Sequence, residues 1–600
     1  RPDIDAVYMT ATQAMTGQGG WPMTVFMTPA GDPFYCGTYF PKPQFMRLVE
    51  AVGRAWRSDR GQVVDQAERI SAALSSNASS LAGLAAPSGD LSWESVTDAA
   101  VAALEDTFDS RDGGFGGAPK FPPSMVLEFL VRQGSPRALR MVTKTGEAMA
   151  RGGIYDQLGG GFARYSVDGT WTVPHFEKML YDNALLARAY LHWWRAAPPR
   201  GDDPPGAPSL ARRVAEETCE FVARELRTAE GGFAASLDAD SAGYPGSGGG
   251  TGSRGDTGSP GGEGAYYVWT PAQLRDVLGE ADGEWAASVF GVTAAGTFEH
   301  GASVLRRRSD PDDLERLDRI RGTLLAAREG RPRPARDDKV VAAWNGMAIA
   351  ALAEAGLLLD RADFLAAASD AASLLVSLHL SDGRLVRTSR DGTASGSAGL
   401  LEDYACVASG LLALAGVSGN DRWVSVAGEL LETVLTSFGD GSGGFYDAPA
   451  DGERLIFRPA DPTDNATPSG TFAAADALLS YAALTGSSRH RDAAVSALKA
   501  LPTLASRYPR AAGMGLAVAQ ALLSGPAEVA IVGPPDDPRT SDLLRTALHA
   551  ASPGAVFALG TGDGDDTGIP LLKGRGLVRG APAAYVCRGF TCRLPVTTPA

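Results

Sequence analysis

The chain has 600 residues, of which 44% are hydrophobic and 21% charged, a composition typical of a folded protein with more than one domain. Its formal net charge of −15 excludes nucleic acid as the main partner, because phosphate binding needs a basic surface. Five scattered cysteines and the lack of a visible signal peptide favour a cytoplasmic protein. The most membrane-like run, residues 340–359, contains Asn345 and Glu354, so we expect a buried helix there and no contact with a membrane.

Residues 1–85 predict the second half of a thioredoxin-like domain. Residues 23–28 (MTVFMT) and 34–36 (FYC) have strand composition, and the turn PAGDP between them predicts a hairpin. A helix is expected over residues 44–56. The Trp21–Pro22 bond, directly before the first strand, is expected to be cis, as in the proline loop of a thioredoxin fold.

Residues 90–525 predict a different architecture, built from helices rich in small residues. Helical periodicity marks residues 94–108, 137–152, 175–194, 210–227, 340–359, 364–380, 401–416, 423–438, 471–486 and 491–507. A glycine-aromatic phrase recurs between them, at 113–117, 159–168, 231–241 and 443–452, with 264–270 as a diverged copy. Repeated helical hairpins indicate an array, either open or closed into a ring. Two insertions, at 197–210 and 243–264, are rich in proline and glycine.

Several of these helices begin with polar or aromatic residues and then become small and apolar. A helix that is apolar almost all round lies inside a structure. We therefore expect a mainly α toroid whose inner helices surround one opening with their polar starts.

Residues 526–600 predict a small α/β tail, with strands at 527–533, 555–560 and 583–589 and a helix at 539–551. Cys587 and Cys592 lie five residues apart in this tail. Three interpretations remain open: a disulfide, a redox partner for a dithiol domain, or two unrelated thiols.

Four segments carry a family resemblance: GQGGWPMTVFMTPAGDPFYCGTYFP (17–41) and residues 152–186, 337–353 and 400–412. They resemble the spermatogenesis-associated-protein-20-like family, thioredoxin-domain proteins once grouped as a domain of unknown function. The resemblance covers nearly the whole chain. It implies a thioredoxin-like domain followed by an (α/α)6 toroid similar to those of six-hairpin glycosidases and N-acylglucosamine 2-epimerases. Family members usually carry a Trp-Cys-His-type redox motif, which we expect upstream of Arg1, and these 600 residues contain no CxxC sequence.

The stretch VPHFEKMLYDN (173–183) carries the main site candidates. With Pro174 in a first helical turn, His175, Lys178 and Asp182 would share one helix face. A histidine near carboxylates suits acid–base chemistry, and paired carboxylates suit sugar hydrolysis. The predicted catalytic residues are His175, Glu177, Asp182, Glu402 and Asp403. The predicted substrate-binding residues are Phe162, Trp171, Tyr181, Asn183, Asp240, Trp269, Trp344, Asn345 and Tyr404.

Each candidate also has a purely structural interpretation, as a helix cap, a turn residue or a core aromatic. The functional hypothesis requires His175, Glu177, Tyr181, Asp182, Trp344, Asn345, Glu402, Asp403 and Tyr404 to converge on one cavity.

Two functions follow from this sequence. The first is a toroid that binds a carbohydrate or similar polyol and epimerises or hydrolyses it, without a cofactor or a metal, since neither a calcium loop nor a zinc spacing is present. The second is a redox-linked chaperone or adaptor whose toroid binds a protein or peptide without turnover.

Overall fold

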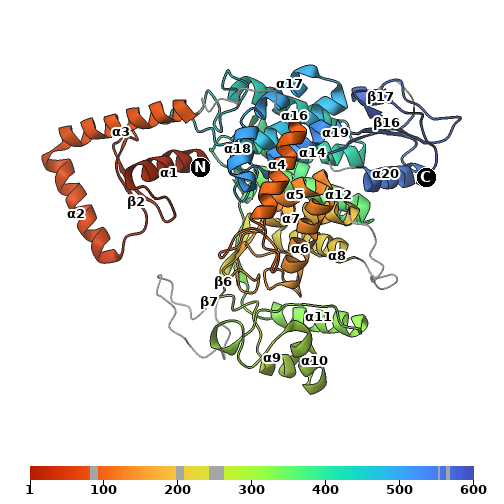
Figure 1. The fold of residues 1–600 in the computed structure, drawn as a ribbon, viewed down its shortest axis with the longest axis horizontal. Coiled ribbons are helices and arrows are strands. Elements are labelled where there is room, and N and C mark those ends of the chain that lie inside the picture. The colour runs from red at the N-terminus through yellow and green to blue at the C-terminus, as the bar shows by residue number, and fades with distance from the viewer. Residues whose placement is uncertain (82–91, 197–208, 242–261, 552–553, 563–567, 600) are drawn as a thin grey trace.

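The computed structural model of the chain describes residues 1–81, 92–196, 209–241, 262–551, 554–562 and 568–599 (Figure 1). The predicted boundary at residues 85–90 and most of the two insertions lie outside these ranges. The described part is mainly helical, with an N-terminal unit, a ring of helical hairpins and a C-terminal sheet.

The N-terminal unit contains the predicted hairpin. Strands β1 (Thr24–Met27) and β2 (Pro33–Gly37) pair antiparallel, and the Trp21–Pro22 bond before them is cis, as predicted. Helices α1 (Pro2–Thr16), α2 (Lys42–Ser58) and α3 (Arg60–Leu81) accompany the hairpin. A small core of Ala11, Cys36 and Leu74 holds α1, β2 and α3 together.

Six helical hairpins form the toroid, and in each an outer helix is followed by an inner one. The pairs are α4 (Trp93–Asp106) with α5 (Ser124–Gln133), α6 (Pro136–Arg151) with α7 (Leu180–Ala196), α8 (Leu210–Phe221) with α12 (Ala342–Leu358), α13 (Ala362–Leu374) with α14 (Leu401–Ser418), α15 (Arg422–Thr433) with α16 (Gly470–Thr485), and α17 (Ser488–Ala497) and α18 (Leu501–Arg507) with α19 (Gly513–Ser524). The inner helices contact one another in the order α5, α7, α12, α14, α16, α19 and back to α5, so the ring is closed. The predicted (α/α)6 toroid is confirmed.

Small residues let the inner helices approach closely. A Cβ atom added to Gly346 on α12 would lie 2.4 Å from the carbonyl oxygen of Cys406 on α14, and one added to Gly410 would lie 2.4 Å from that of Gly346. Of the described helices, only α14 is long and apolar enough to cross a membrane, and 72% of it is buried within the ring. Its composition is therefore that of a core helix.

Two of the six inner helices, α5 and α19, were missed by the sequence analysis. Both are short, with ten and twelve residues, and glycines or prolines stand beside them. The insertion between α8 and α12 holds three further unpredicted helices, α9 (Pro271–Leu278), α10 (Glu280–Phe290) and α11 (Leu314–Glu329), around a separate core (Figure 1). Residues 264–270 lead into this insertion and are not a fifth copy of the repeated loop.

The long connections lie where outer helices end and inner helices begin. Three outer helices finish in a π-helical turn, at Val222–Leu226, Leu375–His379 and Val434–Phe438. Short strands follow in these connections: β3 (Tyr165–Ser166), β4 (Pro174–His175), β5 (Lys178–Met179), β6 (Ser236–Ser241), β7 (Gly262–Glu263), β8 (Pro334–Asp337), β9 (Val340–Val341), β10 (Leu380–Ser381), β11 (Arg384–Leu385), β12 (Thr388–Arg390) and β13 (Thr393–Ala394). They form small sheets over the N-terminal ends of the inner helices.

The C-terminal sheet matches the predicted α/β tail. Its strand order is β15 (Val556–Gly560), β14 (Glu528–Val532), β16 (Ala583–Arg588) and β17 (Thr591–Cys592). Strands β14 and β15 run parallel and are joined through α20 (Pro538–Ala550). Strand β15 packs on α14 and α16, so this sheet covers the C-terminal ends of the inner helices.

Candidate active site

Four of the connections from an outer to an inner helix share one closed conformation. Single bridges join Phe108 to Phe115, Tyr155 to Phe162, Arg227 to Phe233 and Gly439 to Phe445. The second residue of each bridge is a phenylalanine that belongs to the glycine-aromatic phrase, and it is buried. The four predicted copies of this phrase are therefore structurally equivalent, and they anchor each connection in the core just before the inner helix begins.

Two inner helices hold these anchored loops with an asparagine in the first turn. The side chain of Asn183 accepts a hydrogen bond from the N–H of Phe162 at 2.7 Å and donates to its carbonyl oxygen at 3.1 Å. Asn345 makes the same two bonds to Phe233, at 2.8 and 3.0 Å. Both asparagines are fully buried. Their polar groups are used within the fold, so the structure gives them a structural role instead of the predicted substrate-binding one.

Residues 174–179 form two short strands, so the predicted helical start at His175 is wrong. Strand β4 pairs with β3, β5 pairs with β6, and α7 begins only at Leu180. The backbone is extended because neighbouring loops offer it strand partners, which local periodicity cannot reveal. Successive side chains then alternate: His175 and Glu177 reach the surface on one side, whereas Phe176 and Lys178 are buried.

A cluster of ionisable side chains surrounds the imidazole of His175. Nδ1 lies 2.6 Å from Oε1 of Glu263, and Nε2 lies 3.7 Å from Oε2 of Glu177, which also pairs with Arg164 at 2.8 Å. The carboxylates of Glu177 and Glu263 raise the pKa of His175, and the same contact with His175, together with Arg164, lowers that of Glu177. We call Arg164, His175, Glu177, Asp240 and Glu263 the His175 group.

Asp240 belongs to this group through the pairing of β6 with β7. Asp240 and Glu263 are register partners in the two strands. Partial burial, with Asp238 and Glu263 nearby, raises the pKa of Asp240, and His175 opposes this shift. The predicted binding residue Asp240 therefore lies beside the predicted catalytic histidine, although 65 residues separate them in sequence.

Aromatic rings extend the His175 group across the surface. Tyr165 stacks on the ring of His175 with 5.0 Å between centroids, and Phe121 lies against Tyr165 at 4.8 Å. The side chain of Phe121 is 49% exposed. This row gives a flat apolar surface beside the titratable groups.

Asp182 and Tyr181 lie beneath the His175 group in the first turn of α7. Asp182 is 4% exposed, and its Oδ2 has no hydrogen-bond partner. Burial raises the pKa of this carboxyl well above its usual range, only partly opposed by Arg164. The ring of Tyr181 contacts Trp344 at the start of α12, with 4.8 Å between centroids.

Glu402 and Asp403 form a second charged group at the start of α14. Arg387 pairs with Glu402 at 2.7 Å and with Asp403 at 2.8 Å. Asp403 is completely buried and also accepts hydrogen bonds from the N–H groups of Leu400 and Ala343. Burial raises the pKa of Glu402. Asp403 therefore caps two helix starts and has no free surface for a ligand.

The three helix starts lie side by side, as predicted. Trp344 touches Tyr181 on one side, and the neighbouring Ala343 bonds to Asp403 on the other. Neither of the two cavities described below is lined by any of the predicted site residues. A common cavity for these residues stays a prediction.

The remaining aromatic candidates belong to the core. Trp171 is fully buried, and its indole N–H donates to the carbonyl oxygen of Asp112. Tyr404 is 2% exposed, and its hydroxyl accepts a hydrogen bond from the N–H of Leu385. Phe162 and Trp269 are buried as well. Contrary to expectation, these rings have no face open to a sugar, because each fills space between a loop and a helix.

A cavity of about 190 Å³ lies beside β5, the short strand that carries Lys178. Lys178 lies in its wall and pairs with Asp156 at 2.9 Å, and Arg328 pairs with the same carboxylate at 2.8 Å. Burial lowers the pKa of Lys178 to about 8. The sequence analysis missed this buried triad because its members come from three distant loops and helices.

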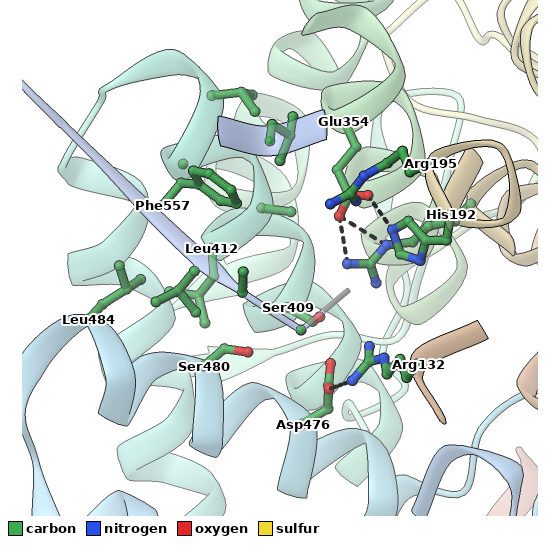
Figure 2. Close-up of a pocket in the computed structure, with 18 residues that line it drawn as sticks. Arg132, His192, Arg195, Glu354, Ser409, Leu412, Asp476, Ser480, Leu484 and Phe557 are labelled. Carbon is green, nitrogen blue, oxygen red and sulfur yellow. Dashed lines mark hydrogen bonds and ion pairs between the residues drawn. The ribbon is translucent and has the colours of Figure 1, made fainter. Parts of the chain in front are cut away.

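A buried charged network crosses the interior of the ring. His192 lies between Glu128 at 2.7 Å and Glu354 at 2.8 Å, Arg188 pairs with Glu354, and Arg132 joins Glu128 to Asp476. A cavity of about 70 Å³ lies beside this network, and Phe557 of the C-terminal sheet forms part of its lining (Figure 2). This network has one indication in the sequence: Arg188, His192 and Arg195 lie four and three residues apart on an otherwise apolar helix.

Known proteins are similar in sequence to this chain. Residues 1–75 match the thioredoxin-like family Thioredox_DsbH, described as "Protein of unknown function, DUF255". "Spermatogenesis-associated protein 20" from Homo sapiens is 32% identical over 662 residues, which cover 100% of this chain and 81% of the human protein. An uncharacterized protein of Caenorhabditis elegans is 27% identical over 648 residues, covering 99% of this chain and 85% of its own length.

Solved structures with a similar fold process sugars. An unsaturated glucuronyl hydrolase from Bacillus sp. GL1 aligns with a TM-score of 0.37 and 12% identity, covering 68% of this chain and 84% of the hydrolase. A cellobiose 2-epimerase from Spirochaeta thermophila aligns with a TM-score of 0.26 and 15% identity, covering 72% and 98%. These likenesses describe the fold alone.

Proposed function

The chain belongs to the spermatogenesis-associated protein 20 family, and we propose that its toroid binds a carbohydrate or similar polyol at the His175 group and acts on it by acid–base chemistry. The observation that carries this proposal is the position of His175. Its imidazole is partly exposed, is held by two carboxylates and stands at the end of a row of aromatic rings.

The two carboxylates determine what His175 does. Because Glu177 and Glu263 stabilise the imidazolium, His175 holds a proton above its usual pKa and can deliver it to a hydroxyl or glycosidic oxygen. Glu177, kept ionised by His175 and Arg164, accepts a proton or hydrogen bonds from sugar hydroxyls. Asp182 adds a buried carboxyl whose pKa is raised, so two carboxyls with opposite pKa shifts stand close together.

The aromatic row supplies binding surface. Sugar rings have apolar faces that pack on aromatic side chains, and polar groups at the edge fix their orientation. The exposed ring of Phe121 and the stacked Tyr165 offer such a face next to His175. Epimerisation and hydrolysis can both use this arrangement, so the two reactions have to be distinguished by their products.

The test is a panel of mono- and disaccharides screened by thermal shift, followed by NMR analysis of products. A ligand at 100 times its Kd stabilises the folded state by about 2.7 kcal/mol, and the shift should disappear in His175→Ala and Glu177→Gln. The matched control is Glu230→Gln, which changes an exposed glutamate outside the His175 group and should bind normally.

One result relocates the site. If Arg333→Gln, in the wall of the cavity beside Lys178, abolishes binding while Glu177→Gln does not, the ligand occupies that cavity and the proposal is overturned. Epimerised products support isomerisation, and new reducing ends support hydrolysis. No shift with any sugar, in a protein that is folded by circular dichroism, rejects carbohydrate binding for this panel.

A second candidate function is binding of a protein or peptide without turnover. It is favoured by exposed apolar side chains in the N-terminal unit, where Trp21 is 74% exposed and Tyr39 is 68% exposed. Crosslinking through a photoreactive residue at Tyr39 tests it. Capture of an unfolded test protein in preference to a folded one supports this function, and no crosslink to either contradicts it.

A further inference from the structure

The C-terminal sheet contains the disulfide that was one of the open interpretations of the sequence. Cys587 on β16 and Cys592 on β17 are register partners across an antiparallel pair, and their sulfur atoms are bonded. The other three cysteines, Cys36, Cys219 and Cys406, are free and buried. Among the described residues, the disulfide thus holds the only cysteine that is not buried, Cys592.

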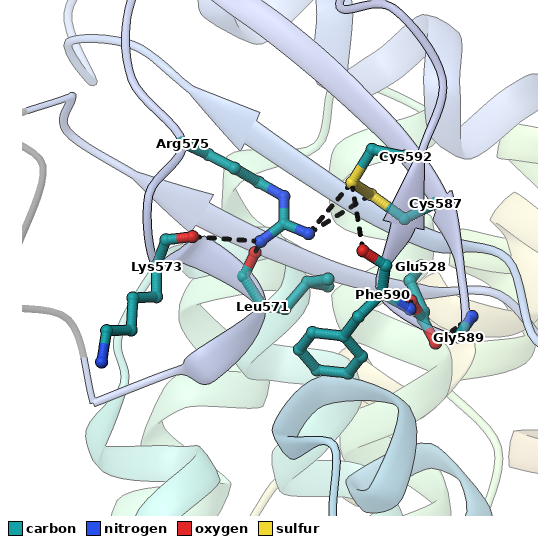
Figure 3. Close-up of a disulfide and its surroundings, with 8 residues drawn as sticks. All are labelled: Glu528, Leu571, Lys573, Arg575, Cys587, Gly589, Phe590 and Cys592. Carbon is teal, nitrogen blue, oxygen red and sulfur yellow. Dashed lines mark hydrogen bonds between the residues drawn. A yellow bond between two sulfur atoms is a disulfide. The ribbon is translucent and has the colours of Figure 1, made fainter.

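An arginine is placed against both sulfur atoms (Figure 3). Nη2 of Arg575 lies 3.0 Å from Sγ of Cys592 and 3.5 Å from Sγ of Cys587. Nη1 donates to the carbonyl oxygens of Leu571 and Lys573. Among the residues that the structure describes, Arg575 forms no ion pair with a carboxylate. Glu528, the nearest acidic neighbour, is engaged by the N–H groups of the hairpin turn, at Gly589 and Phe590.

The hydrogen-bond partners of Arg575 are therefore all neutral while the disulfide is intact. Burial lowers the pKa of this guanidinium, and the more distant charge of Glu528 opposes the shift. A thiolate at either sulfur would neutralise it at hydrogen-bond distance. Cationic neighbours of this kind stabilise thiolates and make them good leaving groups.

The two sulfurs differ in access. Cys587 is 1% exposed, whereas Cys592 is partly exposed on the edge strand of the sheet. Leu594, two residues further along, is 90% exposed. An incoming protein thus meets the edge strand of the sheet, an exposed apolar side chain and a partly exposed cysteine.

We propose that Cys587–Cys592 is a redox-active disulfide that exchanges with a protein dithiol of the thioredoxin class. A thiolate of that protein attacks Sγ of Cys592, the Cys587–Cys592 bond breaks, and Cys587 leaves as a thiolate beside Arg575. The second thiol of the partner then attacks the mixed disulfide and releases Cys592. The partner is oxidised to its disulfide, two electrons pass to this chain, and the two protons lost by the partner's thiols are balanced by protonation of Cys587 and Cys592.

This inference is independent of the carbohydrate proposal, because the sheet lies at the opposite end of the inner helices from His175. Within this chain the exchange requires only Cys587, Cys592 and Arg575. It also names the first sulfur attacked, which makes the order of steps testable.

The experiment uses the full chain with thioredoxin, thioredoxin reductase and NADPH. We expect one NADPH to be consumed per chain, and alkylation with mass spectrometry should find the two new thiols at Cys587 and Cys592. A thioredoxin with a single active-site cysteine should be trapped on Cys592. Trapping on Cys587, or resistance of the native disulfide to thioredoxin while dithiothreitol reduces it, overturns the proposal.

Arg575→Gln tests the role assigned to the guanidinium. Reduction should slow by roughly tenfold with both thioredoxin and dithiothreitol, because the leaving thiolate loses its positive neighbour. Arg539→Gln, on the exposed face of α20 in the same subdomain, is the matched control and should react like the parent chain. Circular dichroism of both variants checks the fold. An unchanged rate in a folded Arg575→Gln protein contradicts the mechanism.

Discussion

Replacing Asn345 by alanine tests whether the polar starts of the inner helices serve the fold or a ligand. The amide of Asn345 makes three buried hydrogen bonds, two with Phe233 and one with the carbonyl oxygen of Val341. Alanine leaves the N–H and carbonyl of Phe233 without these partners, and each unsatisfied buried group costs about 1–3 kcal/mol. We expect a loss of about 3 kcal/mol in the free energy of unfolding.

The loss is measured as a shift in melting temperature. An unfolding entropy of about 2 cal/mol/K per residue makes 1 kcal/mol worth roughly 1 °C for a unit the size of residues 92–525, so the expected fall is about 3 °C. Asn183→Ala should give a similar fall because Asn183 makes the same bonds to Phe162. Asn465→Ala, at an exposed position, is the control and should change stability by less than about 0.5 kcal/mol.

Asn345→Asp adds a sharper measurement. The carboxylate keeps the acceptor for the N–H of Phe233 but loses both donors, so it should destabilise at pH 7. Protonation returns one donor, and the deficit should shrink as the pH falls below the raised pKa of the buried carboxyl. An Asn345→Ala protein with unchanged melting temperature and lost sugar binding would refute the structural role and restore the predicted contact with substrate.

Three further predictions concern the ring. Gly346→Ala should lower the free energy of unfolding by more than about 1 kcal/mol, because the added Cβ would meet the backbone of α14. The control Gly322→Ala, which has open space around it on α11, should raise it by about 0.5–1 kcal/mol. Equal melting temperatures of the two variants would contradict the close packing of α12 and α14. Glu354→Gln should cost about 3–5 kcal/mol because Arg188 and the buried His192 lose their carboxylate partner. Glu432→Gln in an exposed pair should cost less than about 1 kcal/mol, and denaturation midpoints decide between the two outcomes. Burial raises the pKa of Asp464 to about 7, so the folded state binds a proton that the unfolded chain releases above about pH 4. Its contribution to stability should therefore fall as the pH rises from about 4 to 7, and Asp464→Asn should flatten this part of a melting profile; an unchanged slope would show that the carboxyl is ionised in the folded state.

The fold was largely predictable because its signals are local and repeated. Apolar helices such as residues 401–416, and the glycine-aromatic loops between helices, identify the hairpins without knowledge of their partners. The start of α7 was not predictable, because residues 174–179 become strands only through pairing with residues 165–166 and 236–237. The short helices α5 and α19 gave too few turns for a clear period.

The candidate site was predictable in part. Polarity ahead of an apolar helix marked His175 and Glu177 as candidates, and the structure does bring them together. Their clustering with Asp240 and Glu263 was not predicted, because it depends on the pairing of β6 with β7. The same signal misassigned Asn183 and Asn345, because a side chain that bonds to the loop of its own hairpin looks no different in sequence from one that faces a cavity. The network of Glu128, His192 and Glu354 escaped notice since its charges are paired only after the ring closes.

Because the ring closes between α5 and α19, the toroid cannot be completed until its last inner helix has been synthesised. The backbone of Met125 and Val126 on α5 packs directly against Gly513 on α19, so closely that an added Cβ would lie 2.6 Å from it. The ribosome makes α5 long before it makes α19, and five hairpins can assemble while the flank of α5 still lacks its neighbour. Nascent chains stalled before residue 513 should therefore expose this apolar flank to holding chaperones, and release should coincide with emergence of the last inner helix from the ribosomal tunnel.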